Sequence, residues 1–188
     1  MTAIPQLSLA EWVVLAVISE EPKHGFPIAQ LTASSGELGR IWHVPRPVVY
    51  RSLTRLAESG LISEDGSEPG RGPQRTIYAA TQTGREAVGS WLHTPVEHVR
   101  DVRSHLLMKL ALLHRIGADP ASLLRRQQEV LAPIAEAMAA ERPLSADFES
   151  TLLAWRRASA AAAISFLSDV TPPGQRPAPT PGQALAGE

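Results

Sequence analysis

The chain has 188 residues, is 44% hydrophobic and 20% charged, and contains no cysteine, which excludes a disulfide framework and a thiolate zinc site. No stretch approaches the roughly 18 consecutive apolar residues of a membrane span, and the first residues lack the basic and apolar regions of a signal peptide, so we expect a cytoplasmic protein with no membrane partner. The net charge of −1 gives the whole molecule no attraction to nucleic acid, although its arginines are unevenly distributed.

Three helices are predicted in the N-terminal third. Over residues 8–20, Ser8 and Glu11 have the S-x-x-E spacing of a capping box, and apolar residues recur at helical intervals after them. A second helix is expected from about residue 27, where a proline is tolerated in the first turn, and a third over residues 47–59.

A β-hairpin and a further helix follow. Segments 61–63 and 76–79 are predicted strands on either side of a turn-rich tip that contains glycine, proline and arginine. Thr83 and Glu86 have the spacing of a second capping box, which predicts the start of the next helix. The order helix, helix, helix, strand, wing, strand, helix predicts a winged helix-turn-helix DNA-binding domain over residues 1–94.

Only helices are predicted beyond Pro95. They cover residues 101–113, 120–141 and 145–168. The first of them carries more apolar side chains than a single pair of helices can bury. This excess predicts a C2 homodimer held mainly by residues 101–168. The leucines concerned are Leu106, Leu107, Leu110 and Leu113.

The expected fold class is therefore mainly α with a small β-hairpin. A winged helix-turn-helix is followed by an α-helical dimerisation domain over residues 95–170. Residues 171–188 are rich in proline and glycine and nearly uncharged, a composition that predicts a disordered tail.

The predicted third helix has an apolar face and a basic face. Val49, Leu53 and Leu56 have the i, i+4, i+7 spacing of a stripe that faces a core. The opposite arginine stripe could simply be a solvated helix surface. Because it contains no acidic residue and lies on the helix that enters the major groove, we favour DNA binding. The DNA-binding residues predicted in this way are Arg46, Val48, Tyr50, Arg51, Ser52, Arg55, Arg71 and Arg75.

Individual roles follow from position. Arg51, Ser52 and Arg55 are predicted to reach base edges, because they should project from the exposed face. Val48 suits contact with a thymine methyl group. The phosphate contacts, which position a protein without reading sequence, are assigned to Tyr50, Arg71 and Arg75.

Three segments resemble the PadR family of transcriptional regulators. They are HGFPI at 24–28, VYRSLTRLAESGLI at 49–62 and RTIYAATQTG at 75–84. The family pattern is HGYxI, then YPxLxRL ending in GLI, then an arginine-rich wing that closes in YxLTxxG. The resemblance covers about residues 8–92 and implies a homodimeric regulator, usually a repressor, that binds a double-stranded operator and is released by a small molecule. Arg51 replaces the family's proline, so the operator sequence is not carried over.

Other functions have less support. The tryptophans are expected to pack in the core or at interfaces, and Trp12 and Trp91 alternatively line an effector pocket. His98 and His105 lie too far apart in sequence for a tight metal-binding pair, so no metal or cofactor is expected. No nucleophile motif or phosphate loop indicates an enzyme. The alternative to DNA binding is a winged-helix protein-interaction module whose third helix binds protein.

Overall fold

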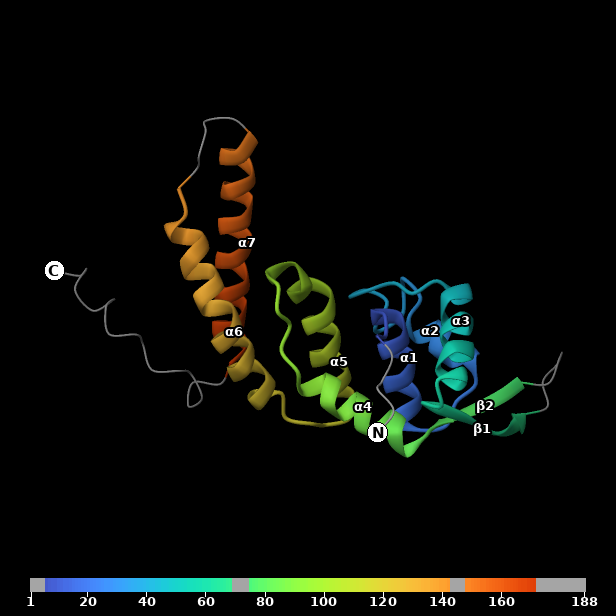
Figure 1. Ribbon diagram of the computed structural model, residues 1–188. Coiled ribbons are helices and arrows are strands. Elements are labelled where there is room, and N and C mark those ends of the chain that lie inside the picture. Colours follow the sequence, from blue (N-terminus) through green and yellow to red (C-terminus); the bar gives the residue numbers. More distant parts are fainter. Residues whose placement is uncertain (1–5, 69–74, 143–147, 172–188) are drawn as a thin grey trace. The chain divides into compact units, whose positions relative to one another are not determined.

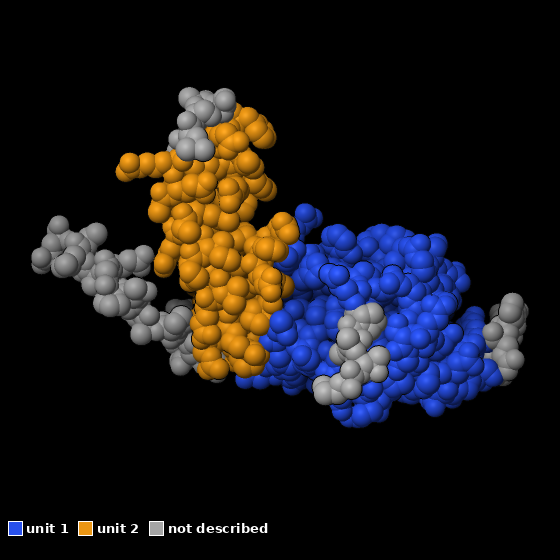
Figure 2. All heavy atoms as spheres, viewed as in Figure 1, with its two compact units in different colours: residues 1–94, 101–119 blue, residues 95–100, 120–188 orange. Residues whose placement is uncertain are grey.

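The computed structural model describes residues 6–68, 75–142 and 148–171 (Figure 1). The chain divides into two compact units, one formed by residues 1–94 and 101–119 and the other by residues 95–100 and 120–188 (Figure 2). Within the described ranges no helix is both long enough and apolar enough to span a membrane.

The first unit begins with three helices, α1 (Leu9–Glu20), α2 (Gly25–Leu31) and α3 (Arg46–Glu58). The capping box predicted at the start of α1 is confirmed. Glu11 N–H donates to the Ser8 hydroxyl, and the Glu11 carboxylate accepts from Ser8 N–H at 2.7 Å. The middle of α1 is buried on nearly all sides, which makes it the central helix of the unit.

Strands β1 (Ile62–Glu68) and β2 (Arg75–Ala80) form the predicted antiparallel hairpin. Its register shifts between Glu64 and Gly66, where Gly66 has a φ of 127° that favours glycine. The hairpin and the three helices before it confirm the winged helix-turn-helix. The wing tip, including Arg71, lies outside the described residues.

The next helix, α4 (Gln82–His93), is capped differently from the prediction. Thr81, not Thr83, is its N-cap, and the Thr81 hydroxyl accepts from Gly84 N–H at 3.1 Å. Gly84 lies against Leu61, because an added Cβ would be 2.1 Å from the Leu61 carbonyl oxygen. The predicted pair of Thr83 and Glu86 is therefore wrong, since α4 begins two residues earlier and packs closely on Leu61, the residue before β1.

The helix predicted over residues 101–113 is divided. A π-helical turn (Val102–Leu106) leads into α5 (Leu107–Arg115), which packs on α4 and α1 within the first unit. The Arg115 guanidinium pairs with both carboxylate oxygens of Glu20 at 2.8 Å, and this pairing raises the pKa of Arg115. Leu106 and Leu113 are fully buried there, so the expectation that they need a second copy to cover them is wrong.

The second unit contains α6 (Ala121–Ala140) and α7 (Phe148–Val170), which run antiparallel along each other (Figure 1). The segment before α5 is fixed to α6 by the buried Gln127. Its side-chain amide accepts from Val96 N–H at 2.7 Å and donates to the Val96 carbonyl at 2.8 Å. Ser145, the first residue of the helix predicted over 145–168, and the tail from Pro172 onward lie outside the described residues.

Candidate nucleic-acid interface

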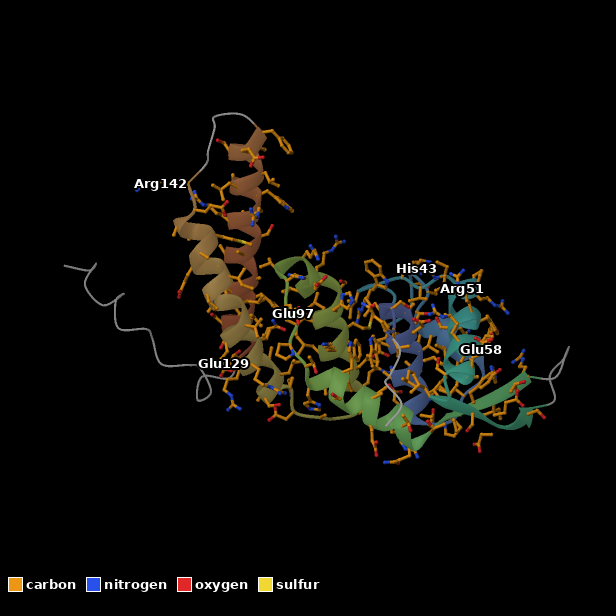
Figure 3. The ribbon with its side chains drawn as sticks, viewed as in Figure 1. His43, Arg51, Glu58, Glu97, Glu129 and Arg142 are labelled. Carbon is orange, nitrogen blue, oxygen red and sulfur yellow. The ribbon has the colours of Figure 1, made fainter. Side chains whose placement is uncertain are left out.

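Helix α3 separates its two faces as predicted. Val49, Leu53 and Leu56 are buried, with exposed fractions of at most 3%. Arg46, Arg51 and Arg55 are exposed, and Figure 3 labels Arg51 on α3. The apolar face of α3 therefore packs in the core of the first unit, and its opposite face presents guanidinium groups to solvent.

Ser52 does not lie on the outer face. Only 3% of it is exposed, and it lines a groove of about 610 Å³ between α1 and α3. The position next to Leu53 and three residues after Val49 places Ser52 beside the core stripe, so its predicted projection from the exposed face is wrong. Val48 is half-buried along the same groove.

Arg55 has an acidic partner, Glu11, that its helical spacing does not predict. Its guanidinium lies 2.9 Å from Glu11 Oε1, and the Glu11 side chain is 3% exposed whereas that of Arg55 is 59% exposed. The other carboxylate oxygen accepts from the Ser8 hydroxyl at 2.8 Å. Arg55 is thus anchored to α1, while Arg51 makes no ion pair among the described residues.

Two further arginines lie beside aromatic rings. Arg46 lies 5.7 Å from the centre of the Phe26 ring and 5.6 Å from that of Tyr50, and Arg75 lies 5.5 Å from Phe26. Arg75 and Tyr50 are exposed, as phosphate contacts need to be. Phe26 was not among the predicted DNA-binding residues, although its place in HGFPI, shortly before the basic helix, is a signal in the sequence.

Trp12 and Trp91, the predicted effector residues, form a stacked pair. Their ring centres are 5.1 Å apart and their planes differ by 3°. The Lys109 ammonium lies 5.0 Å from the Trp91 ring centre and donates to the Thr94 carbonyl. Burial lowers the pKa of Lys109 to about 8. Both rings are half-buried, which is compatible with packing and with contact to an effector, so the effector role stays a prediction.

The remaining two tryptophans do not pack in the core of the chain. Trp42 is 48% exposed beside α3, and Trp155 is 71% exposed on α7. Across residues 6–68, 75–142 and 148–171, no group of three or more His, Asp or Glu side chains is placed to hold a metal ion.

Comparisons with known proteins extend these observations. Residues 14–90 match the model of the transcriptional regulator PadR-like family. The curated relative "Negative transcriptional regulator PadR" of Bacillus subtilis (strain 168) is 21% identical over 124 residues, which are 65% of this chain and 66% of that protein.

Two solved structures are similar over most of their length. The crystal structure of Bacillus subtilis PadR in complex with operator DNA has 18% identity and a TM-score of 0.43, over 87% of this chain and 97% of that one. The Vibrio cholerae virulence activator AphA has 27% identity and a TM-score of 0.38, over 87% of this chain and 95% of that one.

Proposed function

We propose that α3 reads operator DNA. The premise is that the chain carries a domain of the transcriptional regulator PadR-like family, which confirms the resemblance found in its sequence. Members of this family are transcriptional regulators and not enzymes. The observation that carries the proposal is the exposed Arg51 on the outer face of α3, the helix that enters the major groove in this fold. The protein-interaction alternative is less favoured, because this face is basic.

The other predicted contacts divide into two groups. Arg51 contacts base edges, Arg55 contributes from its fixed position beside Glu11, and Val48 contacts a thymine methyl group. Ser52 is left out, because it is buried. The phosphate contacts remain Tyr50, Arg75 and Arg71, the last of which lies outside the described residues, and Arg46 joins them.

Binding measurements with Arg51→Ala test this proposal. One duplex comes from the region upstream of the chain's own gene and the other has a random sequence. We expect the substitution to weaken binding to the first by about 1–3 kcal/mol and to leave the second nearly unchanged. Arg125→Ala, which removes an exposed arginine from α6, is the matched control and should bind as the parent does. Salt-independent binding would contradict DNA binding through these arginines. Equal losses on both duplexes would contradict sequence reading by Arg51.

We also propose that the protein works as a C2 homodimer, a cytoplasmic repressor of the promoter that it occupies. One winged helix reads few base pairs, so two copies on a symmetric operator are needed for tight binding. The support lies on α7, where Phe148, Leu152 and Trp155 are exposed by 72%, 37% and 71%. Their i, i+4, i+7 spacing forms one apolar stripe, which suits a second copy of this helix.

A small-molecule effector completes the proposed function. The half-buried, stacked rings of Trp12 and Trp91 suit a planar aromatic compound, and a coupling of about 1–3 kcal/mol would be enough to release DNA. Operator release by 2-naphthoate, measured in the parent and in Trp91→Leu, tests this part. Release that is the same in both proteins would show that the effector binds elsewhere.

A further inference from the structure

A cluster of rings and guanidinium groups joins three elements of the first unit. Phe26 comes from the first turn of α2, Arg46 and Tyr50 from the start of α3, and Arg75 from the start of β2. Arg46 lies over both rings and Arg75 over that of Phe26, with guanidinium carbons 5.5 to 5.7 Å from the ring centres. One exposed phenyl ring thus contacts an arginine of the recognition helix and an arginine of the wing.

Local structure fixes the two rings. The His24 imidazole caps α2, and its Nδ1 accepts from Phe26 N–H at 3.2 Å. Gly25 allows the ring of Tyr50 to lie close, because an added Cβ would be 2.8 Å from Tyr50 Cε1 and 2.9 Å from Leu53 Cδ1. Any larger residue at this second position of the HGFPI segment would require the Tyr50 and Leu53 side chains to shift.

Backbone hydrogen bonds hold β2 to the same place. Lys23 N–H donates to the Tyr78 carbonyl and Tyr78 N–H donates to the Lys23 carbonyl, both at 3.0 Å. The strand that begins with Arg75 is therefore fixed to the segment that leads into α2. Arg46 and Arg75 consequently lie on one rigid surface.

The chemistry of the cluster differs from that of the other anchored arginine. Glu11 holds Arg55 with a carboxylate, which compensates the arginine charge. An aromatic face holds a guanidinium without compensating its charge and leaves the in-plane N–H groups available to phosphate oxygens. Two cations beside one ring also concentrate positive potential where an anion can bind.

We propose that Phe26 is a positioning residue that sets Arg46 and Arg75 as a two-point clamp for the phosphodiester backbone of DNA. This inference rests on the proposed DNA binding. The clamp acts on every sequence alike, because phosphates carry no sequence information. It also fixes where the wing strand meets the backbone relative to the recognition helix.

Substitutions at Phe26 test the clamp. Phe26→Leu keeps an apolar side chain and removes the ring, whereas Phe26→Tyr keeps the ring and is the matched control. On a random-sequence duplex, we expect Phe26→Leu to bind about three- to tenfold more weakly, with a salt slope shallower by about one, and Phe26→Tyr to bind as the parent does. On the duplex from upstream of the gene the loss should be the same, so that sequence preference is unchanged.

A double-mutant cycle separates the clamp from simple packing. If Phe26 acts through the two arginines, Phe26→Leu causes no further loss in an Arg46→Ala/Arg75→Ala background. A readout without DNA is the ring-current shift of the Arg46 and Arg75 Nε–H signals. Phe26→Leu should remove it at Arg75 and reduce it at Arg46, where the Tyr50 ring remains. Melting curves of Phe26→Leu should match those of the parent, because the side chain is 37% exposed.

The outcomes distinguish this inference from the function on which it rests. Additive losses in the cycle, or parental binding by Phe26→Leu, would overturn the clamp while the effect of Arg51→Ala still supports DNA reading. Absence of salt-dependent binding by the parent would overturn both.

Discussion

The buried carboxylate of Glu11 on α1 lies 2.9 Å from the guanidinium of Arg55 on α3. The same carboxylate closes the capping box that begins α1. One side chain therefore starts the central helix of the unit and holds the proposed recognition helix against it.

We expect Glu11→Gln to lower the free energy of unfolding by about 1–2 kcal/mol, because the amide keeps hydrogen-bonding capacity and loses the charge that pairs with Arg55. Urea denaturation followed by circular dichroism measures this change. Glu58→Gln, which neutralises an exposed carboxylate at the end of α3 (Figure 3), should change stability little. Equal effects of the two substitutions would show that the buried pair adds nothing.

Arg51 and Arg55 should respond differently to alanine substitution. Arg55→Ala leaves the Glu11 carboxylate buried without its partner, so we expect a loss of stability of about 1–3 kcal/mol together with weaker DNA binding. Arg51→Ala should weaken operator binding without a change in melting temperature, because Arg51 is exposed. Thermal melts and binding isotherms on the same samples compare the two. A lower melting temperature of Arg51→Ala would show that Arg51 also contributes to the stability of the folded protein.

Lys109 should make stability depend on pH. Burial lowers its pKa from 10.5 to about 8, so the folded protein binds fewer protons than the unfolded chain between these values. Lys109 should therefore increase the free energy of unfolding as the pH rises from about 8 to about 10. Denaturation of the parent and of Lys109→Met across this range isolates the contribution. Parallel pH profiles of the two proteins would mean that the pKa of Lys109 is not lowered.

The apolar stripe of α7 should determine the oligomeric state. We expect Phe148→Ser/Trp155→Ser to have half the mass of the parent in light scattering and to bind the operator more weakly, because the second DNA-reading module is lost. Ala154→Ser, an exposed position on the same helix, is the control. A double variant with the parental mass would mean that another surface pairs the copies.

Local patterns predicted local structure well. The α1 capping box, the apolar face of α3 and the hairpin each depend on residues a few positions apart. The cap of α4 was missed because it depends on the close approach of Gly84 to Leu61. The helix near residue 101 was predicted as continuous, because periodicity does not reveal the π-helical turn before α5.

The sequence predicted the basic face of α3 but not the contacts that its arginines make with other elements. The basic face of α3 follows from helical spacing, and only Ser52 was placed on the wrong side. The contacts of Arg55 with Glu11 and of Phe26 with Arg46 and Arg75 join different elements, so they depend on the packing of the whole unit.

The division into units limits which parts of the gene can be exchanged by recombination. The polypeptide passes between the two units at residues 94–95, 100–101 and 119–120. A single recombination breakpoint within the gene therefore cannot transplant the α6–α7 unit whole. Cutting before residue 95 also carries away α5, whose Arg115 is bonded to α1, and cutting after residue 119 leaves behind the segment that Gln127 binds. Inheritance of the complete second unit without α5 requires three breakpoints, at residues 94–95, 100–101 and 119–120.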